Sequence, residues 1–321
     1  MKAIVTLTLN PAIDGAAETE RVQPLRKNRT SNERYYPGGG GINVARVVEE
    51  LGGKATAVYL SGGVPGPLFD TLFERTGIAA HHVRIEDNTR FSHVIFERST
   101  GLEYRFVPEG PRIQEREWRS SLEVLDTLEF NFLVASGSLP PGVPSDFYAT
   151  VADLVARKGA RLVLDTSGAP LQRALERGVF MIKPSLGEFE ALIGKSISDP
   201  LTAENEAQAL VRSGAAQVIA LTMGRAGALL ASNEARLKLA PPPVEAKSAV
   251  GAGDSFVGAM TLALAQGRAI QDSFAFGVAA GTAAVLSVGT ELCKRADVER
   301  LHAVLKSHGP GADKSRSSPT A

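Results

Sequence analysis

Residues 248–260 read SAVGAGDSFVGAM, a run of very small residues that ends at Asp254 and leads into an apolar stretch. This pattern predicts a glycine-rich turn followed directly by a helix. Gly251, Ala252 and Gly253 would leave main-chain N–H groups uncovered at the positive end of that helix, where they form a site for an anion. A carboxylate beside such a site repels an anion, so its presence needs an explanation.

Two explanations for Asp254 are open from this stretch alone. As a helix N-cap it would accept a hydrogen bond from an exposed main-chain amide, which is a common role for Asp. As a general base it would take a proton from a hydroxyl that attacks phosphorus, while the anion site stabilises the transferring charge. Capping is the simpler explanation locally, so the rest of the chain has to decide.

Strand-like and helix-like segments alternate outward from this turn. Short apolar runs rich in β-branched residues predict buried strands at 3–9, 56–62, 130–137, 160–168, 179–185 and 217–224. Apolar residues at helical spacing occur at 41–53, 66–77, 145–158, 169–177, 186–194 and 203–213, and most of 254–306 is helical in pattern. This order predicts an α/β fold with a mostly parallel sheet covered on both faces.

Two segments interrupt the alternation. Residues 15–36 are polar without a helical period, and residues 90–107 resemble two strands joined by a Ser-Thr-Gly turn. Both are expected to form a small β layer inserted between βαβ units. The final residues 309–321, GPGADKSRSSPTA, are expected to be a disordered tail.

Composition limits the kinds of partner. The 321 residues include 35 Lys and Arg and 35 Asp and Glu, and this balance argues against nucleic acid or an acidic membrane as the main partner. Cys293 is the one cysteine, so no intrachain disulfide can form, and the five histidines lack metal-ligand spacing. With neither a signal-peptide pattern nor an apolar run of about 18 residues, the chain is expected in the cytoplasm.

A second glycine run precedes the first helix. Residues 37–46 read PGGGGINVAR, and such turns lie where parallel α/β sheets bind ligands, at the carboxyl ends of strands. A dinucleotide fingerprint started at Gly39 meets Val44, and one started at Gly251 meets Phe256, where Gly or Ala is required. The Walker-type phosphate loop does not occur either.

The motifs together are more specific than each alone. PGGGGINVAR, SGSLPPGV at 136–143 and VGAGDSFVGAMTLAL at 250–264 resemble the PfkB family of sugar kinases, and the likeness runs from about residue 3 to 306. The resemblance implies a ribokinase-like three-layer sandwich with a small inserted β-sheet lid. It also implies one kinase domain over residues 1–308, with lid segments at about 15–36 and 90–107, and a homodimer formed through the lids.

The resemblance also implies roles for individual positions. Asp254 matches the catalytic base, and the anion hole matches Gly251, Ala252 and Gly253. Positions around the phosphorylated sugar are Asp14, Lys27, Arg29, Gly39, Gly40, Gly41, Asn43, Arg90, Arg105 and Ser138. Positions on the ATP side are Lys183, Ser185, Thr222, Gly224 and Gly227, and Ser248 and Val250 are further cofactor-binding positions. Glu188 matches an acidic residue linked to Mg²⁺, which prefers oxygen ligands.

The basic residues make chemical sense without the resemblance. A sugar phosphate is a dianion, and the guanidinium fork suits phosphate oxygens. Each of Lys27, Arg29, Arg90 and Arg105 alone would be an ordinary surface charge, but all four fall in the two segments that interrupt the α/β alternation. A neutral acceptor such as ribose or a nucleoside would not need this cluster.

The chain departs from the family pattern at several positions. Ser185 stands where the family usually has Asn, so metal or nucleotide affinity is expected to differ. Some relatives bind a monovalent cation through main-chain oxygens at positions that correspond here to Ser248, Val250, Ala284, Ser287 and Gly289. Ser287 again replaces an Asn, and K⁺ is left open as a further ligand.

Within the family, the chain most resembles the members that phosphorylate the C1 hydroxyl of fructose 6-phosphate to give fructose 1,6-bisphosphate. Kinases of fructose 1-phosphate or tagatose 6-phosphate often have Lys in the glycine run, where this chain has Gly40. Both kinds of kinase remain alternatives. Tagatose 6-phosphate in particular differs from fructose 6-phosphate only in the configuration at one carbon. A non-catalytic sugar-phosphate sensor is a third alternative, but a pure binding protein has no use for a base at Asp254.

Overall fold

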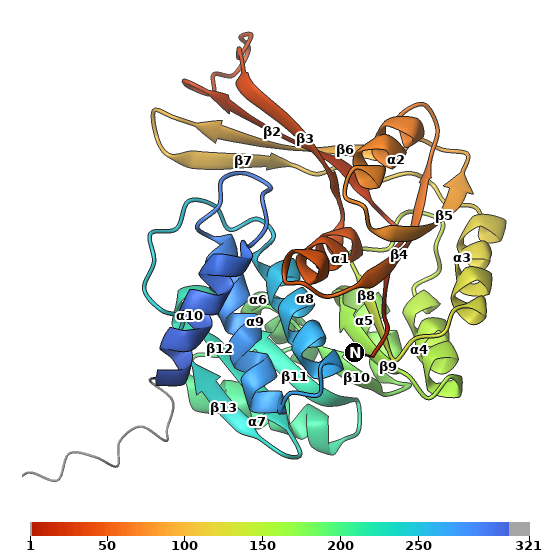
Figure 1. Ribbon diagram of the computed structural model, residues 1–321, viewed down its shortest axis with the longest axis vertical. Coiled ribbons are helices and arrows are strands. Elements are labelled where there is room, and N and C mark those ends of the chain that lie inside the picture. Colours follow the sequence, from red (N-terminus) through yellow and green to blue (C-terminus); the bar gives the residue numbers. More distant parts are fainter. Residues whose placement is uncertain (1, 308–321) are drawn as a thin grey trace, which may run out of the picture.

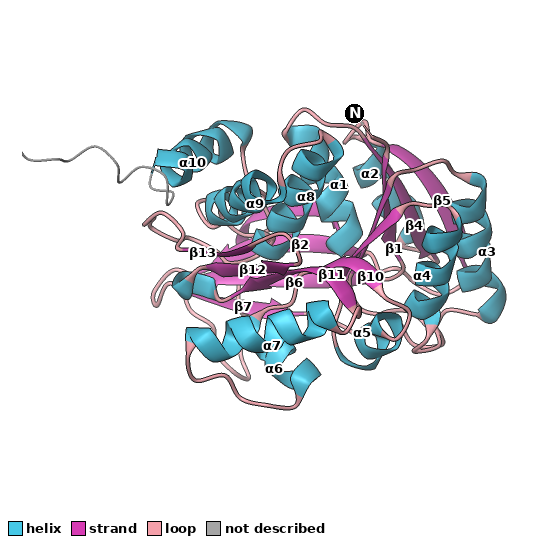
Figure 2. Cartoon of the chain, turned by 90° about the horizontal axis from the view of Figure 1, so that it is seen from below, coloured by secondary structure: helices cyan, strands magenta, loops and turns pink. Residues whose placement is uncertain are grey.

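The computed structural model describes residues 2–307, which form three layers with a projecting lid. A large twisted sheet lies between two layers of helices (Figures 1 and 2). A second, smaller sheet extends from one edge of this body. The described part of the chain therefore has the α/β architecture predicted from the alternation of strands and helices.

The large sheet is parallel through most of its width. Its strands are β1 Ile4–Thr8, β4 Ala55–Gly62, β5 Ala79–Ile85, β8 Phe132–Ser136, β9 Arg161–Asp165, β10 Val179–Ile182, β11 Ala216–Thr222, β12 Ala228–Ser232 and β13 Arg236–Leu239. Their spatial order is β13-β12-β11-β10-β9-β8-β1-β4-β5. β12 pairs antiparallel with both β11 and β13, and the other neighbours pair parallel. The carboxyl ends of the parallel strands thus meet at one edge.

Two hydrophobic cores cover the two faces of this sheet. The first face is packed by helices α1 Gly40–Glu50, α2 Gly66–Glu74, α8 Ala252–Ala265, α9 Ile270–Ala284 and α10 Arg295–Ser307. The second face is packed by helices α3 Glu115–Thr127, α4 Phe147–Arg157, α5 Gly168–Leu175, α6 Leu186–Ile193 and α7 Pro200–Arg212. Because both faces are covered, the central strands are apolar on both sides.

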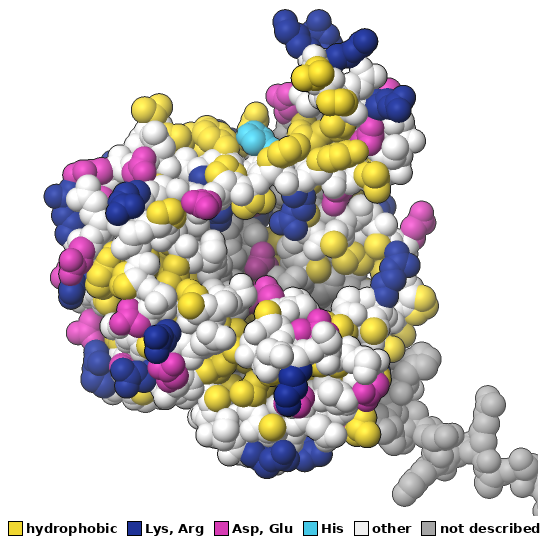
Figure 3. Space-filling view, turned by 180° about the vertical axis from the view of Figure 1, so that it is seen from behind, with side chains coloured by type: hydrophobic (Ala, Val, Ile, Leu, Met, Phe, Trp, Pro, Cys, Tyr) yellow, Lys and Arg dark blue, Asp and Glu magenta, His cyan; other side chains and the backbone are white. Residues whose placement is uncertain are grey.

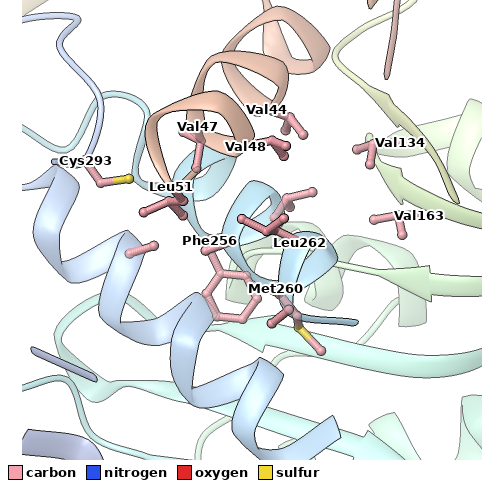
Figure 4. Packing of buried hydrophobic residues seen from close by; sticks show 14 of the residues in the cluster. Val44, Val47, Val48, Leu51, Val134, Val163, Phe256, Met260, Leu262 and Cys293 are labelled. Carbon is pink, nitrogen blue, oxygen red and sulfur yellow. The ribbon is translucent and has the colours of Figure 1, made fainter. Parts of the chain in front are cut away.

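Helix α8 is the most enclosed of these elements. From Ser255 to Ala265 all of its residues are buried, and its side chains pack against α1 and α9 (Figure 4). Phe256 and Met260 point into this packing together with Val47 of α1. A helix that is apolar all round can be stable only inside a core. Its first turn is consequently held in place by packing over the whole length of the helix.

The lid is a four-stranded sheet formed by the two segments that break the βαβ alternation. Its strands are β2 Ala12–Thr19, β3 Ser31–Gly38, β6 Arg90–Glu97 and β7 Leu102–Phe106, in the order β3-β2-β6-β7. A single residue, Gly39, separates the end of β3 from the start of α1, and its φ of 112° is one that favours glycine. The lid is therefore joined to the body without a flexible linker.

Most predicted elements are present, and the differences have local causes. Strand β5 was not predicted because it lies at the sheet edge and is mostly exposed, which gives it no continuous apolar run. Strands β12 and β13 and helix α3 were also missed. The region 254–306 is helical as predicted, as α8, α9 and α10. The expected tail, 309–321, lies outside the described residues.

None of the helices within residues 2–307 combines the length and the apolar character that crossing a bilayer requires.

Candidate active site

A cavity of about 490 Å³ lies between the carboxyl edge of the large sheet and the underside of the lid. This face of the molecule is hollowed beneath the projecting lid (Figure 3). Of the predicted site residues, those that line the cavity are Asp14, Gly39, Gly40, Asn43, Arg90, Arg105, Ser138, Lys183, Glu188, Val250, Gly251 and Asp254. The predicted sugar end and the predicted nucleotide end thus share one cavity.

Asp254 does not cap helix α8. The N-cap is Gly251, in a left-handed conformation with φ 73°, and the cap makes no side-chain hydrogen bond. The Asp254 carboxylate instead accepts a hydrogen bond of 2.9 Å from Asn43 Nδ2 and lines the cavity. The simple capping explanation is therefore wrong, and the carboxylate is available to a bound ligand.

The Asp254 carboxylate is held in an unfavourable environment for its charge. Its pKa is raised to about 6, mainly by burial and also by the nearby carboxylate of Asp165, while Asn43, Lys183 and Arg105 act in the opposite direction. A carboxylate with this pKa is ionised near neutral pH yet accepts a proton more readily than an exposed Asp. This is the property that a general base requires.

A buried ammonium group stands beside the first turn of α8. Lys183 Nζ lies 3.2 Å from Asp165 Oδ1, and both side chains are largely buried. A Cβ atom at Gly253 would lie 3.3 Å from Lys183 Nζ, a tight contact, so the glycine leaves room for the ammonium to approach the main chain. Burial lowers the pKa of Lys183, but the carboxylates of Asp165 and Glu188 outweigh that effect and raise it above its usual value. The ammonium therefore adds positive charge to the predicted anion site.

The other end of the cavity combines one carboxylate with several arginines. The pKa of Asp14 is raised to about 6, mainly by burial, although Arg46 opposes this rise most strongly and Arg90 and Arg105 also oppose it. Arg90 donates hydrogen bonds of 2.8 Å to the carbonyl of Asn10 and 2.7 Å to the carbonyl of Pro108, and its buried Nε has no hydrogen-bond partner among the described residues. A positive surface of this kind suits the phosphate of a sugar phosphate.

Lys27 and Arg29 do not reach this cavity within one chain. Both lie in the exposed loop that joins β2 to β3, at the far end of the lid. Lys and Arg side chains gather at this tip in Figure 3. Asp14, in contrast, lies near the opposite end of β2 and lines the cavity. A single chain thus assembles only part of the predicted phosphate site.

The expected ATP side is also brought together only in part. Lys183, Glu188 and Val250 line the cavity, and the positions that do not line it are Ser185, Thr222, Gly224, Gly227 and Ser248. Ser185, after β10, forms a β-bridge with Thr222, the last residue of β11. Gly224 and Gly227 lie in the short 3₁₀ turn that follows β11. Gly41, Ala252 and Gly253 are likewise outside the lining residues.

The Ser185 hydroxyl has a structural partner. It caps α6, and its N–H and O–H donate to the same Glu188 oxygen, at 2.7 and 2.8 Å. This capping box satisfies main-chain amides at the helix start and fixes the Glu188 carboxylate. The Ser in place of the family's Asn therefore still orients the acidic residue beside it.

Asp165 is the main site residue that the sequence reasoning missed. It ends strand β9, lines the cavity and pairs with Lys183. A signal was present, because polar residues at the carboxyl ends of parallel strands mark the ligand-binding edge of such sheets. Thr290, from the loop before α10, also lines the cavity and carried no such signal.

Comparison with known proteins agrees with this geometry. A family model for pfkB family carbohydrate kinases matches residues 7–297. The chain belongs to the PfkB family. The resemblance inferred from the glycine-rich motifs is thereby confirmed. The ribokinase-like fold is confirmed by the solved ribokinase of Thermotoga maritima, which has a TM-score of 0.74 and 22% identity, covering 94% of this chain and 99% of the other.

Two curated PfkB-family relatives are similar over almost their whole length. The ATP-dependent 6-phosphofructokinase isozyme 2 of Escherichia coli K12 is 39% identical over 307 residues, which cover 95% of this chain and 99% of the relative. The protein of the same name from Mycobacterium tuberculosis is 41% identical over 299 residues, covering 92% and 88%. The 1-phosphofructokinase of Borreliella burgdorferi is less similar, at 32% identity over 93% of this chain and 96% of that relative.

Solved structures of the Escherichia coli phosphofructokinase-2 share the fold. The complex with fructose-6-phosphate has a TM-score of 0.91 and 38% identity, covering 95% of this chain and 100% of the other. The complex with potassium has a TM-score of 0.92 and 39% identity at the same coverage. A tetrameric inhibited form has a TM-score of 0.90 and 38% identity, again at 95% and 100% coverage.

Proposed function

We propose that this PfkB-family kinase transfers the γ-phosphoryl group of ATP to the C1 hydroxyl of fructose 6-phosphate, giving fructose 1,6-bisphosphate and ADP. The observation that carries the proposal is the position of Asp254. Its carboxylate faces the cavity beside the uncapped first turn of α8, with arginines at the other end of the same cavity. The similarity to 6-phosphofructokinases over nearly the whole chain supports the choice of substrate.

The proposed chemistry follows from this arrangement. Asp254 accepts the C1 hydroxyl proton as the sugar oxygen bonds to the γ-phosphorus, and the bond between that phosphorus and the ADP oxygen breaks. The main-chain amides at residues 251–253 and the ammonium of Lys183 stabilise the charge on the transferring group. Asp14 and Asn43 orient the sugar hydroxyls. Closure of the lid excludes water, which limits ATP hydrolysis.

Mg²⁺ belongs to the proposal as a companion of ATP. Within residues 2–307 no three His, Cys, Asp or Glu side chains are grouped so that they could hold a metal ion. Glu188 nevertheless offers a carboxylate in the cavity, fixed by Ser185. This donor set suits a magnesium ion held chiefly by ATP phosphates and linked to Glu188 through water, and the ion would neutralise phosphate charge.

A K⁺ site beside the anion hole is also proposed. Ser248 Oγ donates to the Gly289 carbonyl at 3.2 Å, and Lys247 N donates to the Val285 carbonyl at 2.7 Å. The two segments that would supply main-chain oxygens are therefore adjacent. Ser287 Oγ is bonded to the Leu292 carbonyl, so it fixes the loop.

Gly40 supports fructose 6-phosphate over the alternative ketose phosphates. A Cβ atom at Gly40 would collide with the Ser136 side chain and approach its carbonyl carbon. The Lys that relatives acting on fructose 1-phosphate or tagatose 6-phosphate often carry here would therefore require Ser136 to move. The glycine also leaves the main chain open to the substrate.

One assay separates the proposed function from its alternatives. ADP formation is coupled to absorbance with fructose, fructose 1-phosphate, fructose 6-phosphate, tagatose 6-phosphate and adenosine as separate acceptors. We expect the highest kcat/KM with fructose 6-phosphate. A higher value with another ketose phosphate would reassign the substrate, and binding of fructose 6-phosphate without any turnover would favour the sensor.

Changing Arg90 to Ala is expected to raise KM for fructose 6-phosphate by roughly 10- to 100-fold, the range for loss of a charge-assisted hydrogen bond. Arg90 lines the sugar end of the cavity, and its guanidinium supplies positive charge there. KM for ATP serves as the internal control and is expected to stay unchanged. A rise in KM for ATP instead would show that the sugar end is misplaced.

The pH dependence should follow from the raised pKa values of Asp254 and Asp14, each about 6. Both carboxylates must be ionised in the free enzyme, one to accept a proton and one to bind hydroxyls. We therefore expect kcat/KM for fructose 6-phosphate to fall as pH drops below about 6, with apparent values that belong to the pair. A profile that is flat down to pH 5, in enzyme shown by circular dichroism to be folded, would contradict this.

Assembly and location complete the proposal. We propose one kinase unit over residues 1–308, located in the cytoplasm, that forms a homodimer through its lids. The lid exposes apolar side chains at Tyr35, Leu102 and Phe106, and its outer strands β3 and β7 leave edges open for pairing. In such a dimer, the lid tip with Lys27 and Arg29 would contact the second copy of the chain.

A further inference from the structure

Arg46 stands directly behind the proposed active site. It lies one helical turn after Asn43 on α1, so the two side chains share a face of that helix. Its Nη1 donates a hydrogen bond of 3.1 Å to Asn43 Oδ1 and another of 3.1 Å to the carbonyl of Pro37 in lid strand β3. Its guanidinium carbon lies 5.5 Å from the centre of the Tyr36 ring. Arg46 is absent from the residues that line the cavity.

These contacts determine which way the Asn43 amide points. A guanidinium has only donors, and an ionised carboxylate has only acceptors. Asn43 bonds to both, since its Oδ1 accepts from Arg46 and its Nδ2 donates to Asp254 Oδ2 at 2.9 Å. Only one of the two amide orientations satisfies both partners. Arg46 thereby selects the orientation in which Asn43 donates to Asp254.

Arg46 also contributes charge where two carboxylates face one cavity. Asp14 and Asp254 each raise the free energy of ionising the other. The charged groups facing Asp14 are Arg46 on α1, Arg90 on β6, Arg105 on β7 and Asp254 on α8. The charged groups facing Asp254 are Asp165 on β9, Lys183 after β10, Arg105 on β7, Asp14 on β2 and Arg46 on α1. Among the cations near Asp14, Arg46 has the largest effect.

We propose that Arg46 is a positioning residue for the proton acceptor: it turns the Asn43 amide toward Asp254 and supplies positive charge that lets Asp14 and Asp254 occupy the same cavity. The inference rests on the proposed function, in which Asp254 is the base. It assigns Arg46 no contact with substrate. Replacing Arg46 should therefore change kcat and the pH profile of kcat/KM, and it should leave KM for ATP unchanged.

The test compares Arg46→Met, which removes the charge, with Arg46→Lys, which keeps the charge and loses the planar fork. For Arg46→Met we expect kcat to fall by roughly 10- to 100-fold through misplacement of the base. We also expect the acid limb of kcat/KM, which is the fall in kcat/KM at low pH, to move to a pH about one unit higher, because loss of a nearby cation raises a carboxyl pKa. For Arg46→Lys we expect a lowered kcat with the acid limb in the wild-type position.

Arg161→Met is the matched control. Arg161 also stacks on an aromatic ring, 4.7 Å from the centre of Phe180, but it lies at the opposite end of β9 from Asp165. Its removal should leave kcat and the acid limb unchanged. An equal shift of the acid limb in Arg161→Met would overturn the proposal. So would an Arg46→Met variant whose kcat, or whose acid limb of kcat/KM, is the same as in wild type. If Arg46→Met does not fold, Arg46→Lys decides: a lowered kcat with an unmoved limb supports the proposal, and any other result overturns it.

A titration without turnover separates this inference from the proposed function. The carboxyl carbon of Asp254, assigned by its loss in Asp254→Asn, is followed by ¹³C NMR against pH in wild type and in the two Arg46 variants. The titration midpoint should rise in Arg46→Met and stay in place in Arg46→Lys. Inactivity of the wild type with fructose 6-phosphate would refute the proposed function alone, whereas an unchanged midpoint in Arg46→Met would refute the role of Arg46 alone.

Discussion

Replacing Asp254 with Asn is expected to lower kcat by ~10²-fold or more. The substitution keeps the shape of the side chain and still offers an oxygen to Asn43 Nδ2, so the local geometry is preserved. It removes the carboxylate that we propose accepts the C1 hydroxyl proton. The measurement is a steady-state assay with fructose 6-phosphate at saturating ATP, and KM for ATP should change little.

The stability of this variant distinguishes loss of chemistry from loss of fold. Burial raises the pKa of Asp254 to about 6, so its ionised form at neutral pH is already disfavoured inside the protein. The neutral Asn variant should therefore unfold at the same temperature as wild type or higher. Asp153→Asn, at an exposed pair with Arg177, is the control and should retain full activity. A near-normal kcat in Asp254→Asn would remove Asp254 from the role of base.

The second large effect is expected from Lys183→Met, which should lower the free energy of unfolding by about 3–5 kcal/mol. The change leaves Asp165 as a buried carboxylate without its 3.2 Å ammonium partner and close to two further carboxylates, Asp254 and Glu188. A buried charge without a partner is far more costly than the paired charges. Urea unfolding at pH 7 measures the change.

The double variant Lys183→Met with Asp165→Leu tests the cause. Replacing both members of a buried ion pair by apolar residues should restore most of the stability, whereas kcat should stay low because the ammonium beside Gly253 is gone. Lys195→Met, at the exposed pair with Glu206, is the control and should cost less than about 1 kcal/mol. A double variant no more stable than Lys183→Met would show that burial of Asp165 is not the cause.

The local pattern of the sequence was sufficient for the central features of the site. The small residues before α8 predict an exposed helix start, and the packing of the whole helix makes that start rigid. The glycine run before α1 similarly predicts a close main-chain approach to a ligand. Both predictions depend on residues that are neighbours in sequence. The choice between capping and catalysis at Asp254 could not be made from sequence neighbours, because the hydrogen-bond partner of Asp254, Asn43, is 211 residues away.

Other features depend on contacts that no local pattern shows. Asp165 becomes a site residue only because β9 and β10 are adjacent and bring Lys183 beside it. Lys27 and Arg29 have the right charge for a phosphate, but the strand geometry of the lid carries them away from the cavity of their own chain. The expected effect of Ser185 on ligand affinity stays a prediction, and the structure adds that Ser185 caps a helix with Glu188, three residues on, as its partner.

The one-residue connection at Gly39 has a mechanical consequence. Strand β3 and helix α1 meet there, and four residues later Asn43 holds the carboxylate of Asp254. Because only Gly39 connects these elements, we expect a movement of the lid strand to be passed on to the start of α1. One motion would then both cover the substrate and align the proton acceptor. In an empty enzyme with a raised lid, Asp254 would not be aligned with the position of the sugar hydroxyl.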